Sequence, residues 1–447
     1  MQQCKKDTEV IEPEAPPAVD INGYTCEIIQ DIEITNPLQY LENSLFADAL
    51  LERITKVEEI FGCNIELRYE GVKDSSLSQL IISNITAGTN IGEIIYSFGN
   101  NISSNMAYAD CLYPLTELKD IINYEDSEKY GSAAVLETAM LNSIPYIVSP
   151  VAWTEKQPNG CTYLVVINEA IIKQYNFTDP RELVEQSQWT WNKFEELLPM
   201  YTLQDGEKTT YAFHSFPHYL SKMAVLSNGV RIVDDVDGTV KTDIYSEKAI
   251  DALNWVKKII TDYKDNVIIK GASWEDSYMP FANGETVMCL TNTGSVVTKV
   301  SFLADDFGIV PFPCGPKGEY GKWASVLEGV EGAGILVNAE EPEYAAHIIS
   351  EMFEPFEGYE GREGLLDYYI KQIFYDRRDA ETYLDISKYG KYSYWPVGGD
   401  TFWGSVGSGV KSKTGSELVQ KFGPQLEKVV DEYISTNYEY MKDHLYN

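Results

Sequence analysis

The chain has 447 residues, 44% of them hydrophobic and 12% aromatic, so it can bury the cores of two or three domains and is not globally disordered. Its 69 acidic and 35 basic residues leave a formal net charge of −34, which would repel the phosphates of a nucleic acid and an anionic membrane surface. We therefore expect no nucleic-acid partner and interpret the acidic excess as a solubilising surface. No apolar run approaches the roughly 20 residues that a membrane-spanning helix needs.

The first 22 residues are unlike the rest of the chain. They are polar, contain three prolines before Ala18 and show no periodic apolar positions, which predicts a flexible tether. Cys4 lies where a bacterial lipoprotein would carry its lipid, but Gln2 and Gln3 do not fit the small residues expected before such a cysteine. A lipid anchor at Cys4 is thus one hypothesis, and a free thiol is the other.

The seven cysteines are spread widely and form no C-x-x-C pair, so neither a zinc ribbon nor a dense disulfide framework is expected. His214 and His218 have the i, i+4 spacing that binds zinc on a helix, but Pro217 lies between them and no H-E-x-x-H motif is present. We expect no metal and no other cofactor. The two histidines could instead line a cleft and donate hydrogen bonds to hydroxyl groups.

After the tether, extended and helical patterns alternate. β-branched runs predict strands, and apolar positions at helical spacing ended by glycine predict helices. In chain order these are a strand at 23–35, a helix at 49–62, a strand at 63–71, a helix at 76–88 and a strand at 91–101. This β-α-β-α-β order predicts a parallel sheet covered by helices, whose ligands gather at the carboxyl ends of the strands. Ser97, Asn100 and Asn101 lie at the end of the third strand, and Asn100 and Asn101 are candidate ligand contacts.

The stretch WTWNKFEELL, at residues 189–198, predicts the start of an amphipathic helix. Thr190 is a suitable N-cap, and Pro199 is expected to end the helix. Packing and capping therefore explain its tryptophans better than chemistry does. The apolar stripe consists of Trp191, Phe194, Leu197 and Leu198.

Several such segments, in this order, resemble the extracellular solute-binding proteins of bacterial ABC importers, the class that includes the maltose-binding protein. Thr190, Trp191 and Phe194 are similar to the Thr-Trp-x-x-Phe helix start of that family. Phe281, Gly284 and Met288 are similar to its Phe-x-x-Gly-x-x-x-Met element. The segments at 160–177, 307–318 and 326–353 resemble neighbouring parts of the family, so the resemblance runs from about Gly23 to the C-terminus.

The resemblance implies an α/β, two-lobed periplasmic-binding-protein-like fold of type II. Each lobe would be a mostly parallel sheet flanked by helices, with ligand held between lobes that close about a hinge. We expect lobe one at 23–148 and 272–331, and lobe two at 149–271 and 332–447. The chain would cross between them near Ile144–Trp153, Ile268–Trp274 and Glu328–Gly334.

The expected ligand is a carbohydrate, because aromatic rings cover the apolar faces of a sugar and amides or carboxylates satisfy its hydroxyls. For any one aromatic residue, packing in a core is the alternative. The resemblance favours Trp403 or Trp395 against the sugar, in a glycine- and proline-rich context that leaves rings little helix to pack into. The remaining aromatic candidates are Trp153, Trp274, Trp323 and Phe402, and the polar candidates are Asn100, Asn101, Glu328 and Asp400.

As a member of this family, the protein would act as a monomer on the outer face of the cell membrane or in the periplasm. It would deliver an oligosaccharide to a membrane ABC permease without catalysis. One rival is a glycan hydrolase, which needs two carboxylates at a defined distance. The other is a peptide- or polyamine-binding receptor of the same fold, which the acidic charge would suit.

Overall fold

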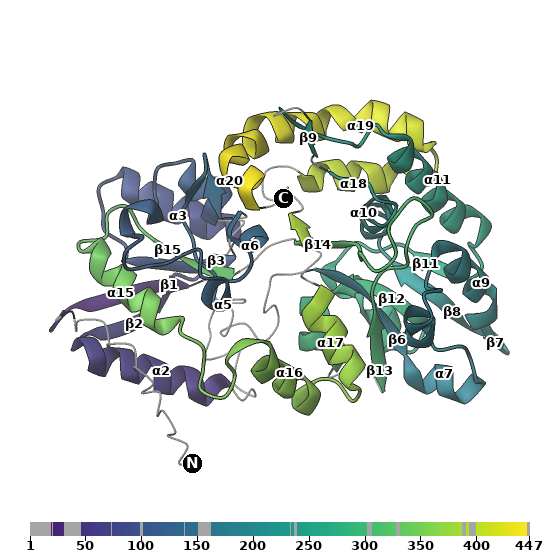
Figure 1. Cartoon of the computed structure of the whole chain (residues 1–447), viewed down its shortest axis with the longest axis horizontal. Coiled ribbons are helices and arrows are strands. Elements are labelled where there is room, and N and C mark those ends of the chain that lie inside the picture. Colours follow the sequence, from purple (N-terminus) through teal and green to yellow (C-terminus); the bar gives the residue numbers. More distant parts are fainter. Residues whose placement is uncertain are drawn as a thin grey trace, which may run out of the picture.

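The computed structural model shows two lobes side by side, each built around a sheet with helices on its faces (Figure 1). This confirms the predicted two-lobed α/β fold. The structure describes residues 19, 21–30, 46–72, 74–98, 102–137, 139–150, 162–232, 234–236, 239–301, 306–327, 331–386, 390–392 and 399–444.

The first lobe contains a four-stranded sheet in the order β15-β3-β1-β2. β1 pairs in parallel with β2 and β3, and β15 pairs antiparallel with β3. Their bounds are β1 Thr25–Gln30, β2 Asn64–Tyr69, β3 Ile94–Phe98 and β15 Glu331–Ile335.

Adjacent isoleucines on β1 and β3 point to opposite faces of this sheet because side chains alternate along a strand. Ile28 and Ile94 pack in one core with α2 (Phe46–Phe61) and α15 (Pro342–Met352). Ile29 and Ile95 pack in another core with α3 (Asp74–Thr86) and the π-helix η1 (Ile102–Ala107). These continuous apolar strands are typical of a sheet covered on both sides.

The second lobe contains a sheet in the order β11-β8-β12-β6-β13, with β7 paired on β8. β8 runs parallel to β11 and β12, whereas β6 is antiparallel to β12 and β13. The bounds are β6 Tyr163–Asn168, β7 Leu203–Asp205, β8 Lys208–Ser215, β11 Val267–Ile269, β12 Thr286–Asn292 and β13 Phe307–Val310.

Helices again cover both faces of the second sheet. One face packs on α9 (Trp191–Tyr201), α10 (Pro217–Ser227) and α11 (Glu247–Asp262), with α18 (Gly399–Gly409) and α19 (Gly415–Val429) beyond them. The other face packs on α16 (Gly361–Gln372) and α17 (Arg377–Ile386). The short helices at its edges are α7 Glu169–Tyr175, α8 Pro180–Glu185, α12 Met279–Ala282 and α13 Thr293–Ser295, with η3 Trp274–Ser277 and η4 Val296–Val300.

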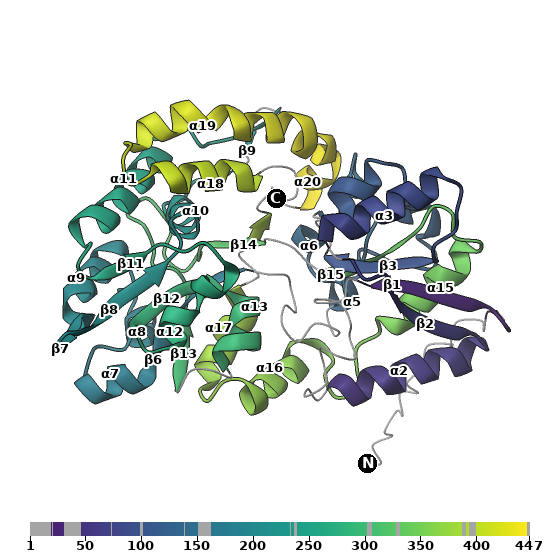
Figure 2. The same ribbon diagram turned by 180° about the vertical axis from the view of Figure 1, so that it is seen from behind.

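Shorter elements lie where the lobes approach each other. In the first lobe these are η2 Leu115–Leu118, α5 Ser127–Tyr130, α6 Ala133–Glu137, β4 Met140–Leu141 and β5 Ile144–Pro145. β14 (Ser325–Leu327) pairs in parallel with β16 (Gly390–Tyr392), and β9 (Asp234–Val236) pairs antiparallel with β10 (Thr239–Lys241). The C-terminal run η7 Val430–Ile434, η8 Ser435–Asn437 and α20 Tyr438–His444 leads from α19 to the first lobe (Figures 1 and 2).

The sheet pairings differ from the expected lobe boundaries in two places. β12 and β13, expected in lobe one, pair with β6 in the second sheet, so the expected crossing at 268–274 is wrong. β15 and α15, expected in lobe two, belong to the first sheet and its core. The physical reason is that alternation and apolar content identify a strand but not its distant partner. The chain passes between the sheets after Pro150 and returns between Leu327 and Glu331.

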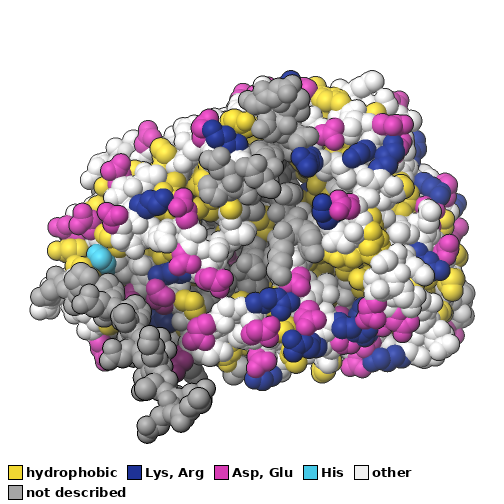
Figure 3. Space-filling model, viewed as in Figure 1, with side chains coloured by type: hydrophobic (Ala, Val, Ile, Leu, Met, Phe, Trp, Pro, Cys, Tyr) yellow, Lys and Arg dark blue, Asp and Glu magenta, His cyan; other side chains and the backbone are white. Residues whose placement is uncertain are grey.

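Charged side chains of both signs are interspersed over the face of the molecule seen in Figure 3. Many carboxylates are paired: Lys317, for example, lies 2.8 Å from Asp251 and 3.1 Å from Glu247. On this face the acidic excess is therefore distributed, as expected for a solubilising surface, and does not form one acidic patch.

Candidate functional site

Three parallel strands of the second sheet end at one edge, where ligands of α/β proteins gather. β8 leads into α10, β11 into η3, and β12 into α13 and η4. The first sheet has a corresponding edge at the carboxyl ends of β1 and β3. The segment from β14 to β15 joins the two lobes, and Ser325 lies only six positions before Glu331, a span of at most about 20 Å. The two edges therefore lie close to the same interlobe space.

A group of aromatic rings begins α10 at the edge of the second sheet. Phe216 lies 5.4 Å from His218 and 5.0 Å from Tyr219, measured between ring centroids. Tyr219 also packs 4.5 Å from Tyr163, the first residue of β6. Phe216 and Tyr163 are buried, whereas His218 and Tyr219 are partly exposed. The last two rings therefore keep part of their surface accessible to a ligand. We call these four residues the α10 ring group.

Buried hydroxyl groups lie beside the α10 ring group, at the end of β12. Thr162 accepts a hydrogen bond from the backbone N–H of Val326 (3.2 Å), is hydrogen-bonded to Ser325 through its hydroxyl, and donates its own N–H to Thr293 (3.2 Å). Ser295 is completely buried, and its hydroxyl has no hydrogen-bond partner in the described structure. The Ser295 hydroxyl can therefore form a hydrogen bond with a polar group of a ligand.

The edge of the first sheet carries two further unpaired polar groups. Gln30, the last residue of β1, is 3% exposed, and Ser97 on the neighbouring strand β3 is 2% exposed. Neither the side-chain amide nitrogen of Gln30 nor the hydroxyl of Ser97 has a hydrogen-bond partner among the residues described. Leaving such buried groups unpaired costs about 1–3 kcal/mol each, so both are candidates for ligand contacts.

His214 lies under this edge and is not available to a ligand. It is 1% exposed, and its ring nitrogens Nδ1 and Nε2 lie 2.8 and 2.7 Å from the carbonyl oxygens of Ile268 and Asp276. Burial lowers the pKa of His214, although the two carbonyl contacts favour the charged ring and offset part of this effect. We therefore exclude His214 from the proposed ligand contacts.

Phe402 and Trp403 lie within the core of the second lobe and are 0% and 1% exposed. They lie in α18, which packs on α10 so closely that a Cβ at Gly407 would lie 2.8 Å from the backbone nitrogen of His218. The glycine-rich context that suggested a loop thus forms a close-packed helix. We therefore exclude Phe402 and Trp403 from the proposed ligand contacts. Trp323 is half-buried and packs 4.9 Å from Tyr320 against the same core.

Trp274 is 43% exposed in η3, and His218 is partly exposed in the α10 ring group, so both remain candidates. The other predicted positions lie outside the described residues or, for Asp400, have only the backbone described. These are Cys4, Asn100, Asn101, Trp153, Glu328, Trp395 and Asp400.

Sequence reasoning missed Gln30, Tyr219 and Ser295, and it placed Ser97 at a strand end without taking it as a ligand contact. Strand ends in an alternating β-α pattern are a general signal for such positions, and that signal directed attention to Asn100 and Asn101 instead. Nothing local distinguishes a buried unpaired hydroxyl from a solvated one, because burial depends on the packing of distant segments.

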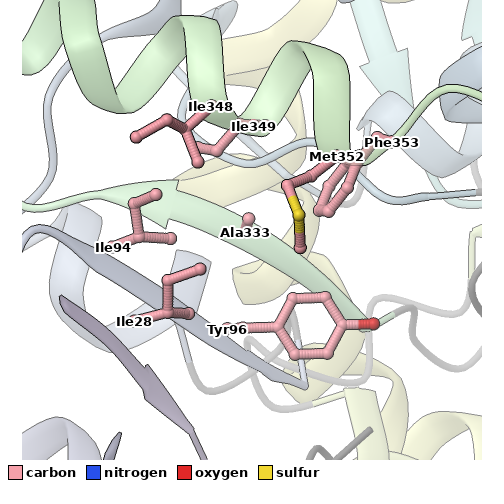
Figure 4. A pocket seen from close by; sticks show the side chains of 8 residues that line it. All are labelled: Ile28, Ile94, Tyr96, Ala333, Ile348, Ile349, Met352 and Phe353. Atoms are coloured by element: carbon pink, nitrogen blue, oxygen red, sulfur yellow. The ribbon is translucent and has the colours of Figure 1, made fainter. Parts of the chain in front are cut away.

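An apolar pocket between the first sheet and α15 does not fit a sugar. Figure 4 shows it lined by carbon-rich side chains from β1, β3, β15 and α15. Such a lining offers almost no partner to hydroxyl groups, which would be buried at a cost. The lining residues are Ile28, Ile94, Tyr96, Ala333, Ile348, Ile349, Met352 and Phe353.

Within the described ranges, no group of three or more His, Cys, Asp or Glu side chains is arranged as metal ligands. Within the same ranges, no helix has the length and apolar content needed to cross a membrane.

Comparison with known proteins identifies the family. The model of the family described as bacterial extracellular solute-binding protein matches residues 52–357, more than half of the chain. The chain belongs to this family. The predicted family is thus confirmed, whereas a search of curated proteins found no match to this solute-binding protein.

Solved structures similar to this solute-binding protein share its fold at low sequence identity. The GacH receptor of Streptomyces glaucescens, solved without ligand and with acarbose, is 12% identical over 92% of this chain and 99% of its own, with a TM-score of 0.64. The maltotriose-binding protein of Thermus thermophilus is 16% identical over 91% and 100%, with a TM-score of 0.58. UgpB from Mycobacterium tuberculosis, in complex with glycerophosphocholine, is 16% identical over 92% and 99%, with a TM-score of 0.60.

Proposed function

We propose that this solute-binding protein holds a carbohydrate between its lobes and delivers it to a membrane ABC importer without breaking any bond in it. The observation that carries the proposal is the pair of buried, unpaired groups at the edge of the first sheet, Gln30 Nε2 and Ser97 Oγ. A sugar hydroxyl can accept from the amide and exchange a hydrogen bond with the serine. The carbohydrate ligands of GacH and the maltotriose-binding protein, which share the fold, support the same class of ligand.

The second lobe would supply the complementary surface. Rings cover the apolar C–H face of a sugar at little cost in side-chain entropy, and the partly exposed rings of His218 and Tyr219 would take this role. Ser295 would pair a hydroxyl on the same side. The lobes close when the ligand binds the closed arrangement more tightly than the open one.

The test is a panel of saccharides, peptides, polyamines and glycerophosphodiesters read by thermal shift and calorimetry, because a ligand that binds the native state raises its stability. We expect a saccharide to stabilise the protein. Ser97→Ala and Gln30→Met should weaken its binding about 5- to 100-fold, the equivalent of about 1–3 kcal/mol. Stabilisation by a peptide, polyamine or glycerophosphodiester and by no saccharide would contradict the proposal. Release of reducing ends would show a hydrolase instead.

Thr286→Val provides a matched control. Thr286 is also completely buried, and its hydroxyl has no hydrogen-bond partner within the described ranges, but it begins β12 at the opposite edge of the second sheet. Valine keeps its shape and removes the hydroxyl. Affinity for the saccharide should therefore stay unchanged.

We further propose that the protein is a monomer held at the outer face of the membrane by a lipid on Cys4. The family is extracellular, and the described helices include none that could span a membrane. Mass spectrometry of protein from the membrane fraction tests the anchor: a diacylglyceryl mass on the peptide containing Cys4 is expected, and a free thiol contradicts it.

A further inference from the structure

Trp274 is the exposed tryptophan of the described structure. It is 43% exposed, whereas Trp189, Trp191, Trp255 and Trp403 are each at most 8% exposed. It begins η3, five positions after β11 ends at the same edge as β8 and β12. A large ring left in solvent at a sheet edge where ligands gather is a candidate contact surface.

Side chains from the sheet hold η3 in place. His214 on β8 and Cys289 on β12 are paired in the sheet register. They bind two consecutive carbonyl groups of η3: His214 Nε2 lies 2.7 Å from the Asp276 oxygen, and Cys289 Sγ lies 3.1 Å from the Ser277 oxygen. Ser273 and Asp276 complete a capping box at the other end. The turn that carries Trp274 is thus rigid although its ring is exposed.

The side chain of Lys299 contacts the Trp274 ring. Lys299 Nζ, from η4 at the end of β12, lies 5.7 Å from the centroid of the Trp274 ring, within cation–π distance. Within the ranges described, no carboxylate lies within ion-pair distance of Lys299, and its ammonium group is therefore able to donate hydrogen bonds to a ligand. Trp274 thus offers a partly exposed apolar ring, and Lys299 places a hydrogen-bond donor over one face of that ring.

This surface adjoins the α10 ring group without being part of it. Phe216 packs against Gly271 so tightly that a Cβ there would lie 1.8 Å from its ring, and Gly271 is three residues before Trp274. Phe216 in turn packs 5.0 Å from Tyr219. The α10 ring group and the surface formed by Trp274 and Lys299 therefore lie next to each other along the edge of the second sheet.

We propose that Trp274 and Lys299 form an outer subsite that binds a distal ring of an oligosaccharide, and that His214 is the positioning residue that holds it. The inference rests on the proposed carbohydrate binding. It adds that the ligand extends beyond the sugar unit at the α10 ring group. His214 contributes through η3, by fixing the angle at which the Trp274 ring faces the edge.

The test measures dissociation constants by calorimetry for a mono-, di-, tri- and tetrasaccharide of one linkage series with the whole protein. In the wild type, affinity should rise with chain length. Trp274→Ala should weaken binding of the longer members about tenfold, consistent with the loss of one ring contact, and leave the shortest bound member unchanged. Lys299→Met should also weaken binding of the longer saccharides and spare the shortest, but by a smaller factor than Trp274→Ala.

His214→Gln should reproduce the length dependence of Trp274→Ala, a readout that a general loss of stability would not produce. Should this variant fail to fold, Trp274→Ala still decides the subsite. Tyr375→Ala is the control, because this ring is 82% exposed at a position between α16 and α17. It should change no affinity.

The outcomes separate the subsite from the proposed function. If the wild type binds saccharides but Trp274→Ala weakens all lengths equally, or none, the subsite is wrong and the proposed function stands. If the wild type binds no saccharide at all, the proposed function fails and the subsite with it.

Discussion

At the scale of single residues, several carboxylates gather around Arg181 in the second lobe. Its guanidinium lies 2.9 Å from Asp379, 2.5 Å from Glu169 and 2.7 Å from Asp179. Asp379 is completely buried and also accepts the N–H of Ile309 at 2.8 Å. Burial raises its pKa to about 6, against which the Ile309 hydrogen bond and Arg181 act only in part. The group ties α17 to β13 and α8.

Asp379→Asn should therefore change how stability depends on pH. An unfolded aspartate has a pKa of about 3.9, so between about pH 4 and 6 the folded state binds more protons at Asp379 than the unfolded state does. The contribution of Asp379 is fully present below about pH 4 and is lost as pH rises through about 6. Relative to Asp379→Asn, the wild type should gain about 1–2 kcal/mol when pH is lowered from 7.5 to 5. Urea unfolding at several pH values measures this, and parallel curves for the two proteins would contradict it.

At the scale of elements, α9 behaves as its sequence predicts except at its end. Thr190 caps the helix by accepting the N–H of Lys193 at 3.4 Å, and Trp191 and Phe194 are buried in the core. The prediction that Pro199 ends the helix is wrong, because α9 continues to Tyr201. The last turn is supported by tertiary packing, since Leu198 and Tyr201 are completely buried.

Thr190→Ala removes this cap and should lower the free energy of unfolding by about 1 kcal/mol, because one N–H at the start of the helix loses its partner. Chemical denaturation measures the change. Thr55→Ala is the control: Thr55 lies within α2, and its hydroxyl donates to the carbonyl of Leu51 at an exposed position. A cost at Thr55 equal to that at Thr190 would argue against capping.

At the scale of the whole molecule, the C-terminal segment ties the lobes together. α19 packs in the core of the second lobe, and irregular π and 3₁₀ turns then lead to Asn437. Asn437 is 6% exposed, accepts the N–H of Ser143 at 2.9 Å and donates to the carbonyl of Met140 at 3.4 Å, both in the first lobe. Both views show α20 beside the first lobe while α18 and α19 cover the second (Figures 1 and 2).

Asn437→Ala should broaden the distribution of lobe separations, because these two hydrogen bonds favour the arrangement seen here. Spin labels or fluorophores placed on the two lobes measure that distribution without ligand, and small-angle scattering gives the radius of gyration. Ser435→Ala should leave both unchanged, since its hydroxyl binds Asp431 within the same helical run. An identical distribution for Asn437→Ala and wild type would show that other contacts set the separation.

The sequence by itself determined the local character of the chain and its family. Cap residues, apolar stripes and β-branched runs identify α9 and the strands β1, β2 and β3 because these signals act between neighbours. The tertiary structure alone decided that β12 joins β6, that Phe402 and Trp403 are core rings, and that His214 holds η3. It also decided that Gln30 and Ser97 are buried without partners. Pairing and burial depend on contacts between residues tens to hundreds of positions apart, and no local pattern encodes those contacts.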